Sequence, residues 1–213
     1  MARKVFNQIT IRFYILVSRM FYMHYVIKLT VFISTIVLTT LSFAAGESGQ
    51  GSAGAACARC HGADGNSSGG QYPSLARQKE EYLIKQMHDF KSGARVNAQM
   101  SPLIAAFSDE QIVAIAKYYS GENIAKQRGI DEDLAKAGGD IAKTRGCAAC
   151  HQANYRGAGV IPRLSRQKRV YLVKSMKDFR DGKRTNDNGI KTEIMKTLTD
   201  DEIKSLSHFL AGM

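Results

Sequence analysis

The chain has 213 residues, of which 44% are hydrophobic, enough for one large globular domain or two small ones. Four cysteines are too few for a disulfide scaffold of this size. The net charge is +11, but residues 1–44 hold five basic and no acidic residues, so removing them leaves +6. The remaining basic residues alternate with acidic ones and form no dense run, which argues against a nucleic-acid-binding protein.

Residues 1–44 have the pattern of an export signal. Lys28 precedes an uncharged, mostly apolar stretch, and the small residues Ser42 and Ala44 stand three and one positions before the expected cut. The apolar stretch covers 16 residues, which is short for a membrane-spanning helix. The preceding region is long, so a start at Met20 or Met23 would leave a more usual signal peptide. An uncleaved membrane anchor is the alternative, and both put the functional part outside the cytoplasm.

Residues 45–213 contain an internal repeat. The offset between the halves is 90 at the cysteines and 89 in the segment that follows, and it reaches 91 near the end. Two residues are therefore inserted in the second half, between Arg184 and Thr199. The matching segments are Cys57–His61 with Cys147–His151, Pro73–Lys79 with Pro162–Lys168, and Ser108–Ile112 with Thr199–Ile203.

Each half is predicted to be helical. Apolar residues recur at helical spacing over 82–90, and Gly93 is a natural helix stop. Ser108 begins a capping box with Gln111, as Thr199 does with Glu202. No segment alternates as a half-buried strand would, so the predicted fold class is all-α. We expect a first domain over residues 45–123, and a polar linker with a second domain over residues 124–213.

Both halves carry Cys-x-x-Cys-His, the attachment signature of c-type haem. Two thiols on one helical turn reach the two vinyl groups of a porphyrin, and the next histidine projects toward the iron. A thioredoxin-like disulfide does not require that histidine. A single zinc site is disfavoured because 86 residues separate the inner cysteines. Two covalent haems are expected, on Cys57, Cys60 and His61, and on Cys147, Cys150 and His151.

The sixth iron ligand is expected in the loop before the last helix of each half. In the first half Met100 lies eight residues before Ser108, and a thioether favours ferrous iron. In the second half the residue eight before Thr199 is Lys191, whereas Met195 aligns with Ile104. A lysine ligand must lose its proton, at a cost of several kcal/mol from a pKa of about 10.4. We therefore predict Met195, with the inserted residues re-routing the loop and Lys191 pointing into solvent. The alternatives are Lys191 as the ligand and an open sixth site.

Other candidates have structural explanations. Met87 and Met176 stand at core positions of their predicted helices. A backbone carbonyl at Pro73 or Pro162 could accept a hydrogen bond from the second ring nitrogen of the haem histidine. The remaining histidines lack a motif: His24 precedes the predicted cleavage site, and His88 and His208 are expected at the surface or an interface.

With both motifs assigned, residues 49–213 resemble the dihaem cytochromes c of the c4 type. The resemblance is carried by Gly49–Gly51, His61–Asn66, the Gln-Lys-x-x-Tyr-Leu stretch at 78–83, and Phe179–Asp187. It implies two class I cytochrome c domains related by a pseudo-twofold axis, with their haems approaching through a shared interface. It also implies that Met100 ligates the first iron. Lys191 is a departure from the family pattern, which leaves the assignment of Met195 less direct.

The resemblance implies a periplasmic protein that shuttles single electrons between respiratory complexes, such as a cytochrome bc complex and a terminal oxidase. Peripheral association with the membrane is compatible with this role. The sequence offers no acid–base constellation beyond the haem ligands, so we predict a carrier and not an enzyme. Two alternatives use the same residues: a cytochrome subunit of a dehydrogenase, and a dihaem peroxidase with one haem open to peroxide.

Overall fold

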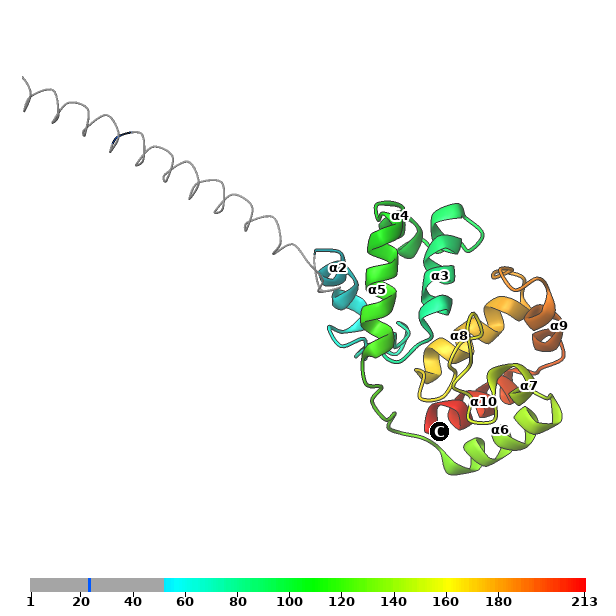
Figure 1. The fold of residues 1–213 in the computed structure, drawn as a ribbon. Helices are drawn as coiled ribbons and strands as arrows, with labels where there is room; N and C mark the ends of the chain where they lie inside the picture. Colours follow the sequence, from blue (N-terminus) through cyan, green and yellow to red (C-terminus); the bar gives the residue numbers. More distant parts are fainter. Residues whose placement is uncertain (1–22, 24–51) are drawn as a thin grey trace, which may run out of the picture. The chain divides into compact units, whose positions relative to one another are not determined.

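The computed structural model describes residue 23 and residues 52–213, and Ser48–Met213 form one compact unit (Figure 1). Apart from residue 23, the predicted signal peptide over residues 1–44, including Met20 and His24, lies outside the described residues. Among the described residues, no helix is long and apolar enough to cross a membrane.

The first half is built around α3, which packs against both α4 and α5, while α2 contacts α5 (Figure 1). Its helices are α2 (Ser52–His61), α3 (Glu80–Ser92), α4 (Met100–Ala105) and α5 (Asp109–Gly121). The buried faces of α3 and α5 meet in one apolar cluster that includes Leu83, Phe90, Ile112 and Tyr119. Burial of these side chains is the main force that holds the short helices together.

The second half follows an irregular linker over residues 122–131 and repeats this order, with two helices in place of α2. Its helices are α6 (Glu132–Thr144), α7 (Ala148–His151), α8 (Arg169–Arg180), α9 (Ile190–Lys196) and α10 (Asp200–Gly212). Helix α10 packs against α6 and α8, and α8 packs against α9 (Figure 1). A second apolar cluster, which includes Leu172, Ile203 and Leu210, forms a core separate from that of the first half.

The local signals in the sequence correspond to the observed helix ends. Gly93 follows α3 with φ +81°, a left-handed conformation that glycine adopts without strain. Ser108 and Thr199 form complete capping boxes with Gln111 and Glu202 at the starts of α5 and α10. Over the described residues the fold is helical, with one isolated β-bridge between Ala158 and Ile161, so the all-α prediction is confirmed.

Helix α6 was not anticipated. Its sequence carries glycines in the helix interior, which weaken a helical pattern. The structure gives Gly138 a reason: a Cβ atom there would collide with the backbone of Ser205, so the glycine lets α6 and α10 cross at close range. The Asp131 side chain caps the helix by accepting the N–H of Leu134 at 3.0 Å. Tertiary packing therefore stabilises a helix that the local sequence signals only weakly.

The two halves meet in a symmetric set of hydrogen bonds. The side chain of Gln78 accepts the N–H of Arg163 (2.7 Å) and donates to its carbonyl (3.1 Å). The repeat partner Gln167 makes the same pair of bonds with the N–H and carbonyl of Ser74, at 2.7 and 3.0 Å. Ser74 and Arg163 are themselves repeat partners, at the same offset of 89. Reciprocal contacts between equivalent residues are the signature of twofold symmetry, here within one chain.

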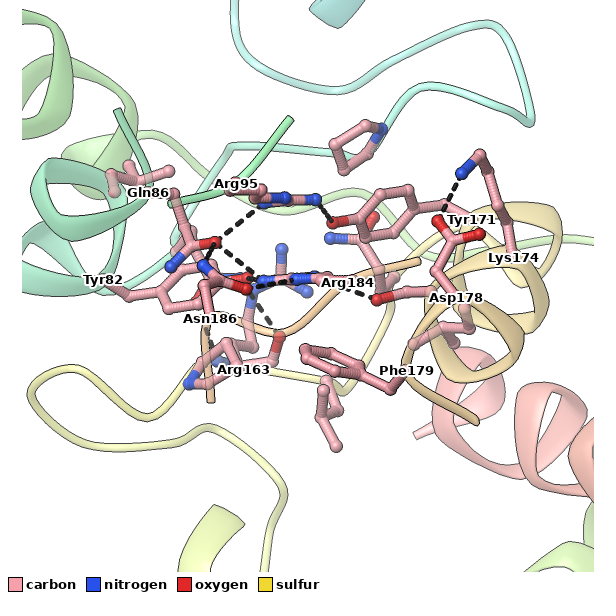
Figure 2. Close-up of a pocket in the computed structure, with 18 of the residues that line it drawn as sticks. Tyr82, Gln86, Arg95, Arg163, Tyr171, Lys174, Asp178, Phe179, Arg184 and Asn186 are labelled. Atoms are coloured by element: carbon pink, nitrogen blue, oxygen red, sulfur yellow. Dashed lines mark hydrogen bonds and ion pairs between the residues drawn. The ribbon is translucent and has the colours of Figure 1, made fainter. Parts of the chain in front are cut away.

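A second symmetric pair lies beside the first. Arg95 donates to the hydroxyl of Tyr171, and its repeat partner Arg184 donates to the hydroxyl of Tyr82, both at 3.2 Å (Figure 2). Arg184 also donates to Gln86 of the first half at 2.7 Å, and both are buried. Buried polar groups that are hydrogen-bonded across the interface stabilise this arrangement of the two halves, because other arrangements leave them without partners.

Candidate haem sites

The two attachment motifs lie at corresponding places in the halves. In the first half Cys57, Cys60 and His61 all belong to α2, and Cys57 and His61 are buried. In the second half Cys147 immediately precedes α7, which ends at His151. None of the four cysteines forms a disulfide. Burial raises the pKa of Cys57 to about 11 and raises that of Cys147, which favours the protonated thiols before haem is attached.

Both motif histidines are oriented by the backbone of a proline. Nδ1 of His61 lies 2.8 Å from the carbonyl oxygen of Pro73, and Nδ1 of His151 lies 3.0 Å from that of Pro162. A carbonyl only accepts, so Nδ1 carries the proton and Nε2 is left as the metal-binding nitrogen. Burial lowers the pKa of both rings, which favours the neutral imidazole that ligation requires. The predicted role of the two proline carbonyls is confirmed.

The two motifs open onto one cavity of about 660 Å³, within the range typical of cofactor pockets. Its walls come from both halves and include all four cysteines, both motif histidines, Met100, Lys191 and Met195. Apolar side chains such as Leu83, Phe90 and Leu172 line the inner wall. A large planar apolar group at each motif would complete the two small cores.

The polar side of this cavity is basic (Figure 2). A haem brings two propionate carboxylates, so an excess of positive charge on the wall fits the group. Arg184 is buried, and Nε of the buried Arg163 has no hydrogen-bond partner. Burial lowers the pKa of Arg163 to about 10, the sign of a cation held away from water. The basic residues of the lining include Lys85, Arg95, Arg163, Lys174, Arg184 and Lys191.

The sixth-ligand candidates all lie on the short helix before the last helix of each half. Met100 is the first residue of α4 and is half-buried against the first core. Lys191 is the second residue of α9, and Met195 lies one turn further along the same helix. Residues four apart share one face of a helix, so Lys191 and Met195 both face the cavity.

The position of the two inserted residues differs from our expectation. The turns that follow α4 and α9 are the same: Phe107 N–H donates to Ile104, and Leu198 N–H donates to Met195, both at 3.0 Å. Ahead of these helices Arg95 and Arg184 still correspond at an offset of 89, each donating its N–H to an aspartate carbonyl at 2.9 Å. The insertion therefore lies before α9, and the prediction that it re-routes the chain around Met195 is wrong.

Lys191 also departs from expectation, because it does not point into solvent. Its side chain is half-buried, and Nζ lies 4.7 Å from the centre of the buried Phe179 ring. Burial lowers the pKa of Lys191 to about 8, with the guanidinium of Arg184 adding to the effect. The proton is therefore lost more easily than the ordinary pKa of lysine implies.

Two further predictions concern histidines. His208, expected at the surface or an interface, is instead buried: its Nδ1 accepts the N–H of Asp131 at 2.9 Å and its Nε2 lies 3.0 Å from Arg169. It thereby ties the linker to α10. His88 is half-buried.

The sequence patterns did not predict the role of Gln78 and Gln167 at the interface. Both halves have glutamine at this repeat position, which is the feature of the sequence that could have indicated it.

Comparison with known proteins is consistent with this geometry. Residues 135–213 match the family model described as cytochrome c, and residues 44–118 match that of subunit III of cbb3-type cytochrome c oxidase. Cytochrome c4 of Pseudomonas aeruginosa is 37% identical over 192 residues, covering 84% of this chain and 94% of that protein. The chain belongs to the cytochrome c4 family. It is a dihaem electron-transfer protein with two covalently bound c-type haems.

Two other relatives help to define the family context. The crystal structure of reduced recombinant cytochrome c4 from Pseudomonas stutzeri superposes with a TM-score of 0.72 at 34% identity, covering 78% of this chain and 96% of that one. The thiosulfate dehydrogenase electron acceptor of Stutzerimonas stutzeri is 34% identical over 181 residues, covering 78% of this chain and 83% of that protein. Haem attachment accounts for the cysteine pairs, so the thioredoxin-like and zinc interpretations are set aside.

Proposed function

We propose that this cytochrome c4 works in the periplasm, taking single electrons from a cytochrome bc complex or a dehydrogenase and delivering them to a terminal oxidase. The observation that carries the proposal is the single cavity shared by the two attachment motifs. Two cofactor sites that open onto one cavity across a twofold interface allow an electron to enter through one half and leave through the other.

We assign the first haem to the thiols of Cys57 and Cys60, with His61 and Met100 as iron ligands. We assign the second haem to the thiols of Cys147 and Cys150, with His151 as the proximal ligand and the sixth ligand on α9. When bound, the haem iron supplies one-electron chemistry by alternating between ferrous and ferric forms. The protein supplies covalent attachment, neutral imidazoles oriented by proline carbonyls, and a basic wall for the propionates.

A closed first site supports the role of carrier over that of peroxidase. Met100 is half-buried and lines the cavity, so its thioether can occupy the sixth position and leave no room there for substrate. The proposed carrier therefore changes its oxidation state without binding a small-molecule substrate. A peroxidase would require one haem with an open position.

A second candidate partner follows from the relatives. The likeness to a thiosulfate dehydrogenase electron acceptor favours a dehydrogenase as the electron donor, either as a soluble encounter or as a fixed subunit. Both arrangements use the same two haems. They differ in whether this chain is purified alone or together with its donor.

The test uses the mature holoprotein from a host that matures c-type cytochromes. Denaturing mass spectrometry is expected to give the chain plus two haem masses, and the reduced protein is expected to be oxidised by membranes that contain a terminal oxidase. Stopped-flow reduction by thiosulfate dehydrogenase with thiosulfate tests the second donor. One haem mass, or a reduced protein that no oxidase preparation oxidises, would contradict the proposal.

A further inference from the structure

The second half differs from the first at the sixth-ligand position itself. Helices α4 and α9 correspond at an offset of 91, fixed by the identical turns that follow them. At that offset Lys191 takes the place of Met100, and Met195 takes the place of Ile104. The comparison rests on backbone hydrogen bonds and does not depend on how the two sequences are aligned.

Met195 stands at a position that a core residue occupies in the first half, although its own side chain is half-buried. Ile104 is fully buried, as part of the apolar cluster of the first half. Met195 packs against the corresponding cluster of the second half, and its carbonyl accepts the same turn-closing bond as that of Ile104. A flexible thioether fills such a position well without binding metal.

The environment of Lys191 is that of a group turned toward the cofactor cavity. Its ammonium lies over Phe179, whose repeat partner Phe90 belongs to the cluster against which Met100 packs. Within the described part of the chain, no carboxylate lies within ion-pair distance of Nζ of Lys191. The carboxylate of Asp187 instead accepts the N–H groups of Gly189 and Thr192. Asp187 therefore attracts this ammonium from beyond ion-pair distance. Half-burying an ammonium that forms no ion pair is unfavourable unless the amine has another role.

We propose that Lys191, and not Met195, is the sixth ligand of the second haem iron, so that one chain carries a His61/Met100 haem and a His151/Lys191 haem. The inference rests on the proposed haem assignments above. A neutral amine is a harder donor than a thioether and does not favour ferrous iron in the same way. The second haem is then the lower in potential, and electrons flow downhill from the second half to the first.

The experiment uses the holoprotein with both haems verified by mass spectrometry. A methionine–iron bond gives ferric haem a weak charge-transfer absorption at the red end of the spectrum, and an amine–iron bond does not. If Lys191 is the ligand, Met100→Leu abolishes this absorption completely, because no other methionine is bound to iron. If Met195 is the ligand, about half of the absorption survives in the same variant, which overturns the proposal.

Matched leucine variants test the two candidates on α9. Met195→Leu is expected to leave the absorption and both haem potentials as in the wild type. Lys191→Leu is expected to keep the absorption of the first haem while opening the second haem to imidazole. Lys191→Met restores six-coordination, is expected to double the absorption, and raises the lower potential toward the higher one.

The reverse pattern, in which Met195→Leu opens the second haem and Lys191→Leu changes nothing, overturns the inference while leaving the dihaem carrier intact. A protein with fewer than two haems would instead contradict the proposed function.

Discussion

The two halves of this cytochrome share a fold but differ at the position proposed for the sixth iron ligand. Their capping boxes and histidine–proline hydrogen bonds correspond, and the glutamine pairs at the interface between them are symmetric. Yet the first half has Met100 where the second has Lys191. If these residues are the ligands, a duplicated scaffold keeps its packing and changes its electronics at one position, because both side chains are only half-buried at the edge of their cores.

The largest effect should come from removing one haem. Cys147→Ala combined with Cys150→Ala is expected to leave one haem mass per chain and to destabilise α6–α10, because the second half loses the group that fills its cavity. Denaturing mass spectrometry and circular dichroism measure these changes. The matched variant, Cys57→Ala with Cys60→Ala, should lose the first haem and keep the second. Unchanged haem content in either variant would contradict the assignment of the motifs.

The next effect concerns the ligand of the first haem. Met100→Ala should open that iron to carbon monoxide and lower its potential by on the order of a tenth of a volt, within the roughly 0.8 V over which axial ligands act. Spectroelectrochemistry measures the shift, with Met87→Leu as the control because Met87 is a buried core residue. A Met100→Ala protein that binds no carbon monoxide at the first haem would show that the ligand lies elsewhere.

A smaller effect is expected at the close crossing of α6 and α10 in the second half. Gly138→Ala should lower the free energy of unfolding of the second half by about 1–3 kcal/mol, because its Cβ would collide with the backbone of Ser205. Denaturant unfolding followed at the second haem measures this. Gly139→Ala is the control: its Cβ would meet the Phe209 ring at 3.3 Å, a milder contact that the gain in helix propensity offsets. Equal losses in both variants would be evidence against the close helix crossing.

The smallest effect is a pH dependence confined to the second half. Burial lowers the pKa of His208, with the positive charges of Arg169 and Lys204 acting the same way and Asp131 opposing them. The stability from the neutral ring is fully present above the unfolded pKa of about 6.5 and is lost as pH falls toward the lowered folded value. The free energy of unfolding should fall by about 1 kcal/mol, the typical net contribution of one hydrogen bond.

Unfolding of wild type and of His208→Gln as a function of pH tests this prediction. The repeat partner in the first half is the exposed Lys117, so the first half should lack this particular dependence. If His208→Gln follows the same pH curve as the wild type, His208 is not the group responsible.

The sequence alone determined the fold class, the duplication and the two attachment motifs. These follow from local rules: helical spacing, capping boxes at Ser108 and Thr199, and Cys-x-x-Cys-His, in which neighbouring residues fix the chemistry. Even the contact of each motif histidine with a proline carbonyl could be proposed, since a proline follows that histidine by 12 residues in the first half and by 11 in the second.

Only the tertiary structure decided where the inserted residues lie, and with them the register of α9. Counting residues in the sequence left both Met195 and Lys191 as candidates for the sixth ligand of the second haem. The sequence does not say where between two matched segments an insertion lies, whereas the backbone hydrogen bonds do. The same holds for α6, whose Gly138 weakens the helix locally but allows the crossing with α10. The burial of His208 and the glutamine pairs across the interface also involve residues far apart in the chain, and such contacts form only once the helices have packed.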